Sequence, residues 1–142
     1  MRLVSLTLFA LTGLVVGCWA TFLPESFYSD FPGVRPGYVS VDGPYNQHLV
    51  RDVGAMFLAL GALTVGAMIV RTTTVTRLTG LAWLVFSVPH AFYHFTHLHV
   101  FQPLDQALNV VGLSALVLLA LVLVVLPAKV SGAGGPARSR VP

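Results

Sequence analysis

Four long apolar runs, each bounded by charged or turn-forming residues, constrain this chain more than any other feature. They cover about residues 3–23, 49–70, 78–97 and 107–126. About 20 apolar residues in a helix cross the hydrocarbon core of a bilayer, and in lipid only helices or closed barrels satisfy the backbone. The sequence therefore predicts an all-α fold, an integral membrane four-helix bundle over residues 1–128.

The composition excludes an ordinary water-soluble globule. Of 142 residues, 56% are apolar and 9% are charged, whereas soluble domains carry about a quarter charged residues. The chain has room for four crossings and their connections, and for no separate soluble domain.

The connections between the runs differ in length. Residues 24–47 hold four prolines and three glycines, so this outer segment is not expected to continue a helix. The connections at 71–77 and 98–101 are short, which predicts that the second, third and fourth helices are antiparallel neighbours. Residues 129–142 are predicted to form a disordered cytoplasmic tail.

The basic residues indicate the orientation, because Lys and Arg accumulate in short cytoplasmic loops. With four spans, one side carries Arg2, Arg71, Arg77, Lys129, Arg138 and Arg140, and the other carries Arg35 and Arg51. Both termini are then cytoplasmic, and the protein is expected to be a multi-pass protein of a bacterial plasma membrane. The net charge of +3 is interpreted as a topology signal and not as nucleic-acid binding.

The chain has one cysteine, Cys18, which excludes an internal disulfide and a zinc finger. The run that ends in Val15-Val16-Gly17-Cys18 also resembles a lipoprotein signal, which would be cleaved before a lipid-bearing cysteine. The preferred interpretation is an uncleaved first helix, because the apolar run continues beyond Cys18 to a full crossing length.

The third run contains a row of histidines. His90, His94 and His97 fall within about 60° of arc on one face of a helix, and His99 lies on the opposite side. Two neighbouring helices offer polar partners at the same depth, which are His48 and Asp52 on the second helix and Gln102, Asp105, Gln106 and Asn109 on the fourth. Since an ionisable group at membrane depth is costly unless it faces the bundle interior, these polar faces are expected to meet.

Rows of small residues predict where helices pack closely. On the first helix the row is Ala10, Gly13, Gly17 and Ala20, and on the second it is Ala55, Ala59, Ala62 and Gly66. The second row follows His48 and Asp52 on one face, so it is expected to turn that pair inward.

The polar site could bind a metal, because neutral imidazoles with carboxylates suit zinc, iron or copper. The candidate ligands are His48, Asp52, His90, His94, His97 and Asp105, and the cofactor would be a transition metal or haem. Two alternatives stay open, which are a hydrogen-bond network that fixes the bundle and a site for a polar ligand headgroup. The sequence contains no H-E-x-x-H or H-x-x-E-H string.

Three stretches carry a family resemblance. SFYSDFPG at 26–33, VSVDGPYNQHLVRDVGAMFLALG at 39–61 and SVPHAFYHFTHL at 87–98 resemble an uncharacterised family of small four-span membrane proteins of high-GC Gram-positive bacteria. The R-D-x-G start of the second helix is also distantly similar to the DoxX-like four-helix membrane proteins. These resemblances imply a fold and no activity.

Two functions follow as expectations. In the first, the protein is a binding or accessory subunit of a larger membrane assembly, with membrane lipid and other membrane subunits as partners and no nucleic acid. In the second, it is a metal- or haem-dependent membrane redox enzyme in which Asp52 or Asp105 acts as a base.

Overall fold

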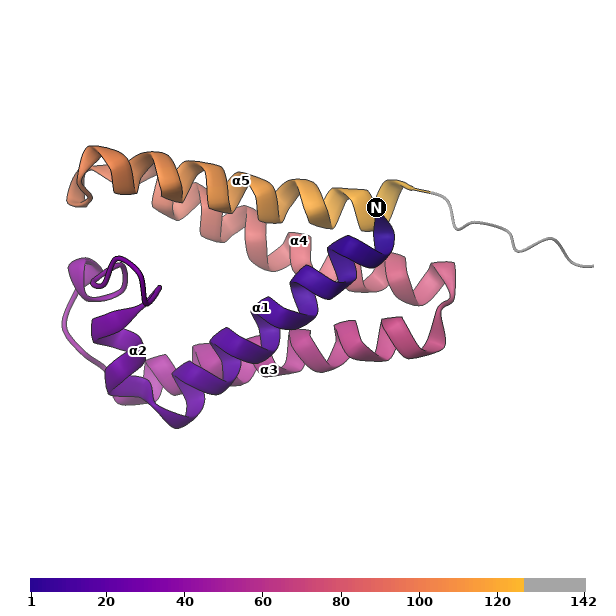
Figure 1. Ribbon diagram of the computed structural model, residues 1–142, viewed down its shortest axis with the longest axis horizontal. Helices are drawn as coiled ribbons and strands as arrows, with labels where there is room; N and C mark the ends of the chain where they lie inside the picture. Colours follow the sequence, from indigo (N-terminus) through magenta and orange to yellow (C-terminus); the bar gives the residue numbers. More distant parts are fainter. Residues whose placement is uncertain (127–142) are drawn as a thin grey trace, which may run out of the picture.

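The computed structural model describes residues 1–126, which form an all-α structure without strands (Figure 1). Its helices are α1 (Arg2–Phe22), α2 (Pro24–Asp30), α3 (Gln47–Val70), α4 (Thr73–Thr96) and α5 (Pro103–Val125), with short 3-10 turns η1 (Ser40–Asp42) and η2 (Leu98–Val100). The predicted tail and its basic residues Lys129, Arg138 and Arg140 lie outside the described residues.

Local capping residues fix where α3 and α4 begin. The side chain of Asn46 accepts a hydrogen bond from the Leu49 N–H at 3.1 Å, and Thr72 Oγ1 accepts one from the Val75 N–H at 3.3 Å. These bonds satisfy N–H groups that have no partner within the helix. The outer segment 24–47 does not continue α1, which ends at Phe22. A separate short helix, α2, begins in this segment because Pro24 occupies its first turn, where the missing N–H costs nothing.

The long helices form two antiparallel pairs, α1 with α3 and α4 with α5, and α3 also packs against α4 (Figure 1). The predicted small-residue row on α1 is confirmed, since Ala10, Gly13, Gly17 and Ala20 are all buried. The predicted row on α3 is wrong. Ala55, Ala59 and Ala62 are exposed, and α3 buries Val50, Gly54, Phe57, Gly61, Thr64 and Ala67 instead.

An aromatic cluster joins the two pairs at the centre of the structure. Trp83 of α4 and Phe9 of α1 are fully buried, and their rings stack with centroids 4.3 Å apart. The Trp83 indole N–H donates to Thr64 Oγ1 of α3 at 2.9 Å. One side chain of α4 therefore contacts both helices of the other pair.

Three helices, α1, α3 and α5, are long and apolar enough to cross a membrane. Helix α4 has 24 residues and packs along α5, so the four-span arrangement stays a prediction. The N-terminus, the α3–α4 turn and the end of α5 lie at one end of the structure (Figure 1), where the Arg2 guanidinium donates to the Leu126 carbonyl. Helix α2 lies at the opposite end, which is called the outer end below.

Candidate functional site

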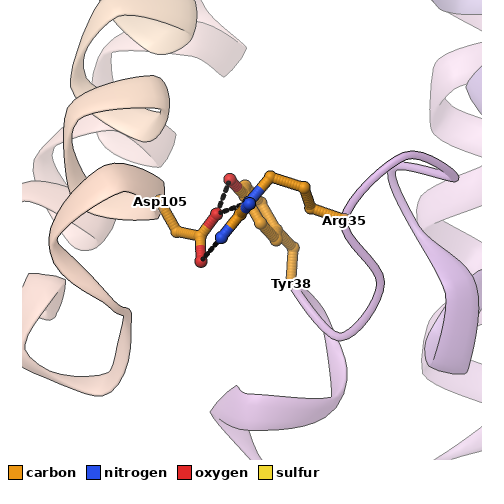
Figure 2. Close-up of polar contacts among 3 residues, drawn as sticks. All are labelled: Arg35, Tyr38 and Asp105. Atoms are coloured by element: carbon orange, nitrogen blue, oxygen red, sulfur yellow. Dashed lines mark hydrogen bonds and ion pairs between the residues drawn. The ribbon is translucent and has the colours of Figure 1, made fainter.

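The best-defined polar group at the outer end consists of Arg35, Tyr38 and Asp105, which are called the outer latch here (Figure 2). Arg35 Nε donates to Asp105 Oδ1, and Arg35 Nη2 donates to Asp105 Oδ2 at 3.1 Å. The Tyr38 hydroxyl donates to Asp105 Oδ1 at 2.9 Å. Both carboxylate oxygens are therefore engaged by donors from a single loop.

Two distant segments bring the outer latch together. Asp105 lies in the first turn of α5, just after Pro103, and is 9% exposed. Arg35 and Tyr38 come from the loop between α2 and η1, in which Gly37 has a φ of 100° that favours glycine. The Tyr38 ring packs on Phe101 with centroids 5.3 Å apart. The outer loop is thereby fastened to the α4–α5 pair.

The outer latch changes the proton affinities of its two loop residues. Burial raises the pKa of the Tyr38 hydroxyl above its usual 10.0, and the hydrogen bond to Asp105 raises it further. The hydrogen bond and charge of Asp105 also raise the pKa of Arg35. Both loop residues are thus held in their protonated, donating forms, which is the state that a carboxylate acceptor requires.

Two buried polar atoms lie below the outer latch. Asn109, one turn after Asp105, is 8% exposed, and within residues 1–126 neither its Nδ2 nor His94 Nδ1 has a hydrogen-bond partner. A Cβ on Gly80 would meet Leu123, and because α4 and α5 are antiparallel this register places His94 at the level of Asn109. This level of the bundle has donor and acceptor capacity that the described protein atoms do not use.

The structure keeps part of the predicted histidine row. The rings of His90 and His94 are neighbours, with centroids 4.6 Å apart. His97 lies just past the end of α4, where its ring stacks on Tyr93 at 4.2 Å and lies 6.1 Å from the ring of His99. The prediction continued the helical spacing to His99, whereas α4 ends at Thr96, so the expectation that His97 and His99 diverge is wrong.

The expectation that His48 and Asp52 face inward is also wrong. His48 Nε2 lies 3.1 Å from Asp52 Oδ2, but their side chains are 88% and 61% exposed. Helix α3 turns its Val50 and Gly54 face toward α1 and leaves this pair outside.

The six predicted metal ligands are therefore dispersed. Asp105 pairs with Arg35, His48 pairs with Asp52 on the surface, and His97 lies past the end of α4 with its ring stacked on Tyr93. Over residues 1–126, no group of three His, Cys, Asp or Glu side chains is placed to hold one metal ion. Metal binding by these residues stays a prediction.

Sequence reasoning missed Arg35 and Tyr38 as partners of Asp105. The available signal was that Arg35 is one of two basic residues on the outer side, while Asp105 begins an apolar helix and needs a partner there. The path of the loop could not be predicted from the sequence. The turn at Gly37 decides which α5 residue the Arg35 guanidinium reaches.

Comparison with protein-family models, with curated proteins and with solved structures finds no match for this chain.

Proposed function

We propose that the protein is a multi-pass membrane protein that acts as a binding or accessory subunit of a larger membrane assembly, without chemical turnover. Embedding in lipid is supported by the apolar side chains that the bundle leaves exposed. On α5 these include Leu104, Leu108, Val111, Leu118 and Val125, which are 47–68% exposed. A surface of this kind suits lipid or an apolar partner.

The engaged carboxylate of Asp105 carries the functional proposal. A general base or a metal ligand uses a lone pair on the atom that reacts, and the two oxygens of a carboxylate have about four lone pairs between them. In Asp105 most of this capacity is taken, because Oδ1 accepts from Arg35 and from Tyr38 and Oδ2 accepts from Arg35. This arrangement favours a residue that shapes the outer end of the bundle over one that performs chemistry.

A size measurement on the tagged chain, produced at its natural level and extracted in a mild detergent, tests the proposal. We expect the wild type to migrate in an assembly larger than the monomer. The Arg35→Gln variant, which frees the outer loop, should shift toward the monomer, whereas Arg77→Gln at the other end should not. A wild type that is monomeric and holds no ligand would overturn the proposal.

Metal analysis of the same preparation tests the alternative function. A stoichiometric metal or haem that His94→Ala removes and His99→Ala retains would support the redox enzyme instead. His94 is the informative position because its ring lies next to His90 and its Nδ1 has no hydrogen-bond partner among residues 1–126, whereas His99 is exposed.

A further inference from the structure

A pocket at the outer end lies where α1 ends and where α2 and α3 begin. Its volume is about 390 Å³, and its lining includes Phe22, Leu23, Glu25, Ser26, Gln47 and Arg51. This volume is within the range of small-molecule sites. Because α1 and α3 are candidate membrane spans, their outer ends place this pocket at the level of lipid headgroups.

Hydrogen bonds hold the α2 wall of the pocket in position. The Trp19 indole N–H donates to Ser26 Oγ at 3.1 Å, and Ser26 in turn donates to Asp30 Oδ2 at 2.8 Å. The Trp19 ring also meets Phe27 edge to face, with centroids 5.9 Å apart. Helix α2 is thus fixed against α1, and Glu25 is fixed with it.

The α3 wall is fixed by close backbone packing. A Cβ on Gly54 would lie 2.6 Å from the Thr21 nitrogen, so α1 and α3 are in contact just below the pocket. Arg51 lies three residues before Gly54 on α3. Helix packing therefore holds in position the backbones that carry Arg51 and Glu25.

The two charges in the pocket are opposite and unpaired. Within residues 1–126 the ion pairs are Arg35 with Asp105 and His48 with Asp52, and neither includes Glu25 or Arg51. A cation and an anion that line one pocket without meeting are complementary to a ligand that carries both charges.

The apolar part of the lining indicates the rest of the ligand. Phe22 and Leu23 at the end of α1 are 68% and 61% exposed. They offer an apolar surface next to the charged groups of the pocket.

We propose that this pocket binds a phospholipid with a primary amine in its headgroup, of the phosphatidylethanolamine class. Arg51 binds the phosphodiester, Glu25 accepts hydrogen bonds from the ammonium group, and Phe22 and Leu23 contact the upper acyl chains. A choline headgroup has no N–H to donate to Glu25, and a glycerol headgroup brings no positive charge to it. The inference rests on the membrane insertion proposed above.

The test is a titration of the purified full chain in detergent with chain-matched phosphatidylethanolamine, phosphatidylcholine and phosphatidylglycerol, followed by native mass spectrometry. The wild type should bind phosphatidylethanolamine about two- to fivefold more tightly than phosphatidylcholine, as expected of an exposed ion pair. Glu25→Gln should abolish this preference, and Arg51→Gln should weaken all three lipids by a similar factor.

Two variants serve as matched controls. Asp42→Asn removes an acid of the outer loop that does not line the pocket, and Arg77→Gln removes a basic residue from α4. Both should keep the wild-type preference. The proposed site is wrong if Glu25→Gln also keeps the preference for phosphatidylethanolamine, or if the wild type binds the ethanolamine and choline lipids equally.

Membrane insertion is measured separately, by resistance of the chain to extraction from membranes at alkaline pH. A chain that resists extraction but has no lipid preference contradicts the pocket assignment alone. A chain that is extracted contradicts the proposed function itself.

Discussion

Gly13 of α1 and Gly61 of α3 meet with no side chain between them, because a Cβ on Gly13 would lie 2.6 Å from the Cα of Gly61 and 3.0 Å from the Phe57 carbonyl oxygen. The obstructing atoms belong to the backbone, so they cannot move aside as a flexible side chain could. The α1–α3 pair therefore depends on glycine at this position.

Replacing Gly13 by Ala should force the two helices apart and lower the free energy of unfolding by about 1–3 kcal/mol. Thermal unfolding in detergent, followed by circular dichroism, measures the loss. Gly66→Ala is the matched control, because within residues 1–126 its added Cβ would meet no atom within 4 Å beyond its chain neighbours and the backbone of its own helix, and alanine favours the helix. If both variants unfold at the same temperature, the assigned packing face is wrong.

The exposed alanines of α3 give a second prediction. Ala59→Leu and Ala62→Leu should leave the free energy of unfolding within about 0.5 kcal/mol of the wild type, since both positions are exposed. The sequence alone predicted a packing role for them. Destabilisation comparable to that of Gly13→Ala would restore that role and contradict the observed rotation of α3.

Trp83 and Thr64 should be energetically coupled through their hydrogen bond of 2.9 Å. We expect a double-mutant cycle with Trp83→Phe and Thr64→Val to give a coupling of about 0.5–1.5 kcal/mol, the usual net contribution of such a bond. Chemical unfolding in mixed micelles provides the four free energies. Additive effects of the two changes would show that the indole and the hydroxyl act independently.

Breaking the outer latch should release the outer loop before it unfolds the helices. Arg35→Gln removes the cation from the Asp105 carboxylate, and because the Arg35 side chain is 44% exposed the loss of this ion pair should destabilise the helices only slightly. Limited proteolysis within 24–47 should accelerate, whereas Arg51→Gln should leave the rate unchanged. Protection equal to the wild type would contradict the role of Arg35 in holding the loop.

The pH dependence of Tyr38 has a defined sign. Because burial and the Asp105 hydrogen bond raise its pKa above 10.0, the folded chain keeps this proton where the unfolded chain loses it. The stabilisation is complete below about pH 10 and is lost as the pH rises through the raised value. The difference in tyrosinate absorbance between wild type and Tyr38→Phe should therefore have its midpoint above 10.0. A midpoint at or below that value would contradict the buried hydrogen bond.

The existence and length of the long helices could be predicted from the sequence. A long apolar run must make its backbone hydrogen bonds internally in an apolar environment, and a helix does so. The row of Ala10, Gly13, Gly17 and Ala20 on α1 was also predictable, since small residues at helical spacing mark a close contact. On α3 the same reasoning failed because two rows of small residues compete. Gly54 and Gly61 lie on one face and Ala55, Ala59 and Ala62 on another, and only the partner helix decides between them.

The candidate site was less predictable, because it joins residues that are far apart in the chain. Asp105 and Asn109 were correctly expected to be buried polar residues of the last helix, since both lie on one face of its first turns. The partner of Asp105 comes from a loop with glycines at positive φ. The path of such a loop cannot be predicted from helical periodicity. His97 was misplaced because the residue that ends a helix depends on local capping and not on periodicity.

The order of synthesis gives the outer latch a consequence for biogenesis. The ribosome makes Arg35 and Tyr38 well before Asp105, so the outer loop has no carboxylate to hold until the first turn of α5 has been made. A nascent chain that ends before residue 105 therefore cannot close the outer latch, whereas a longer chain can. Closure of the loop reports that synthesis has passed the start of α5.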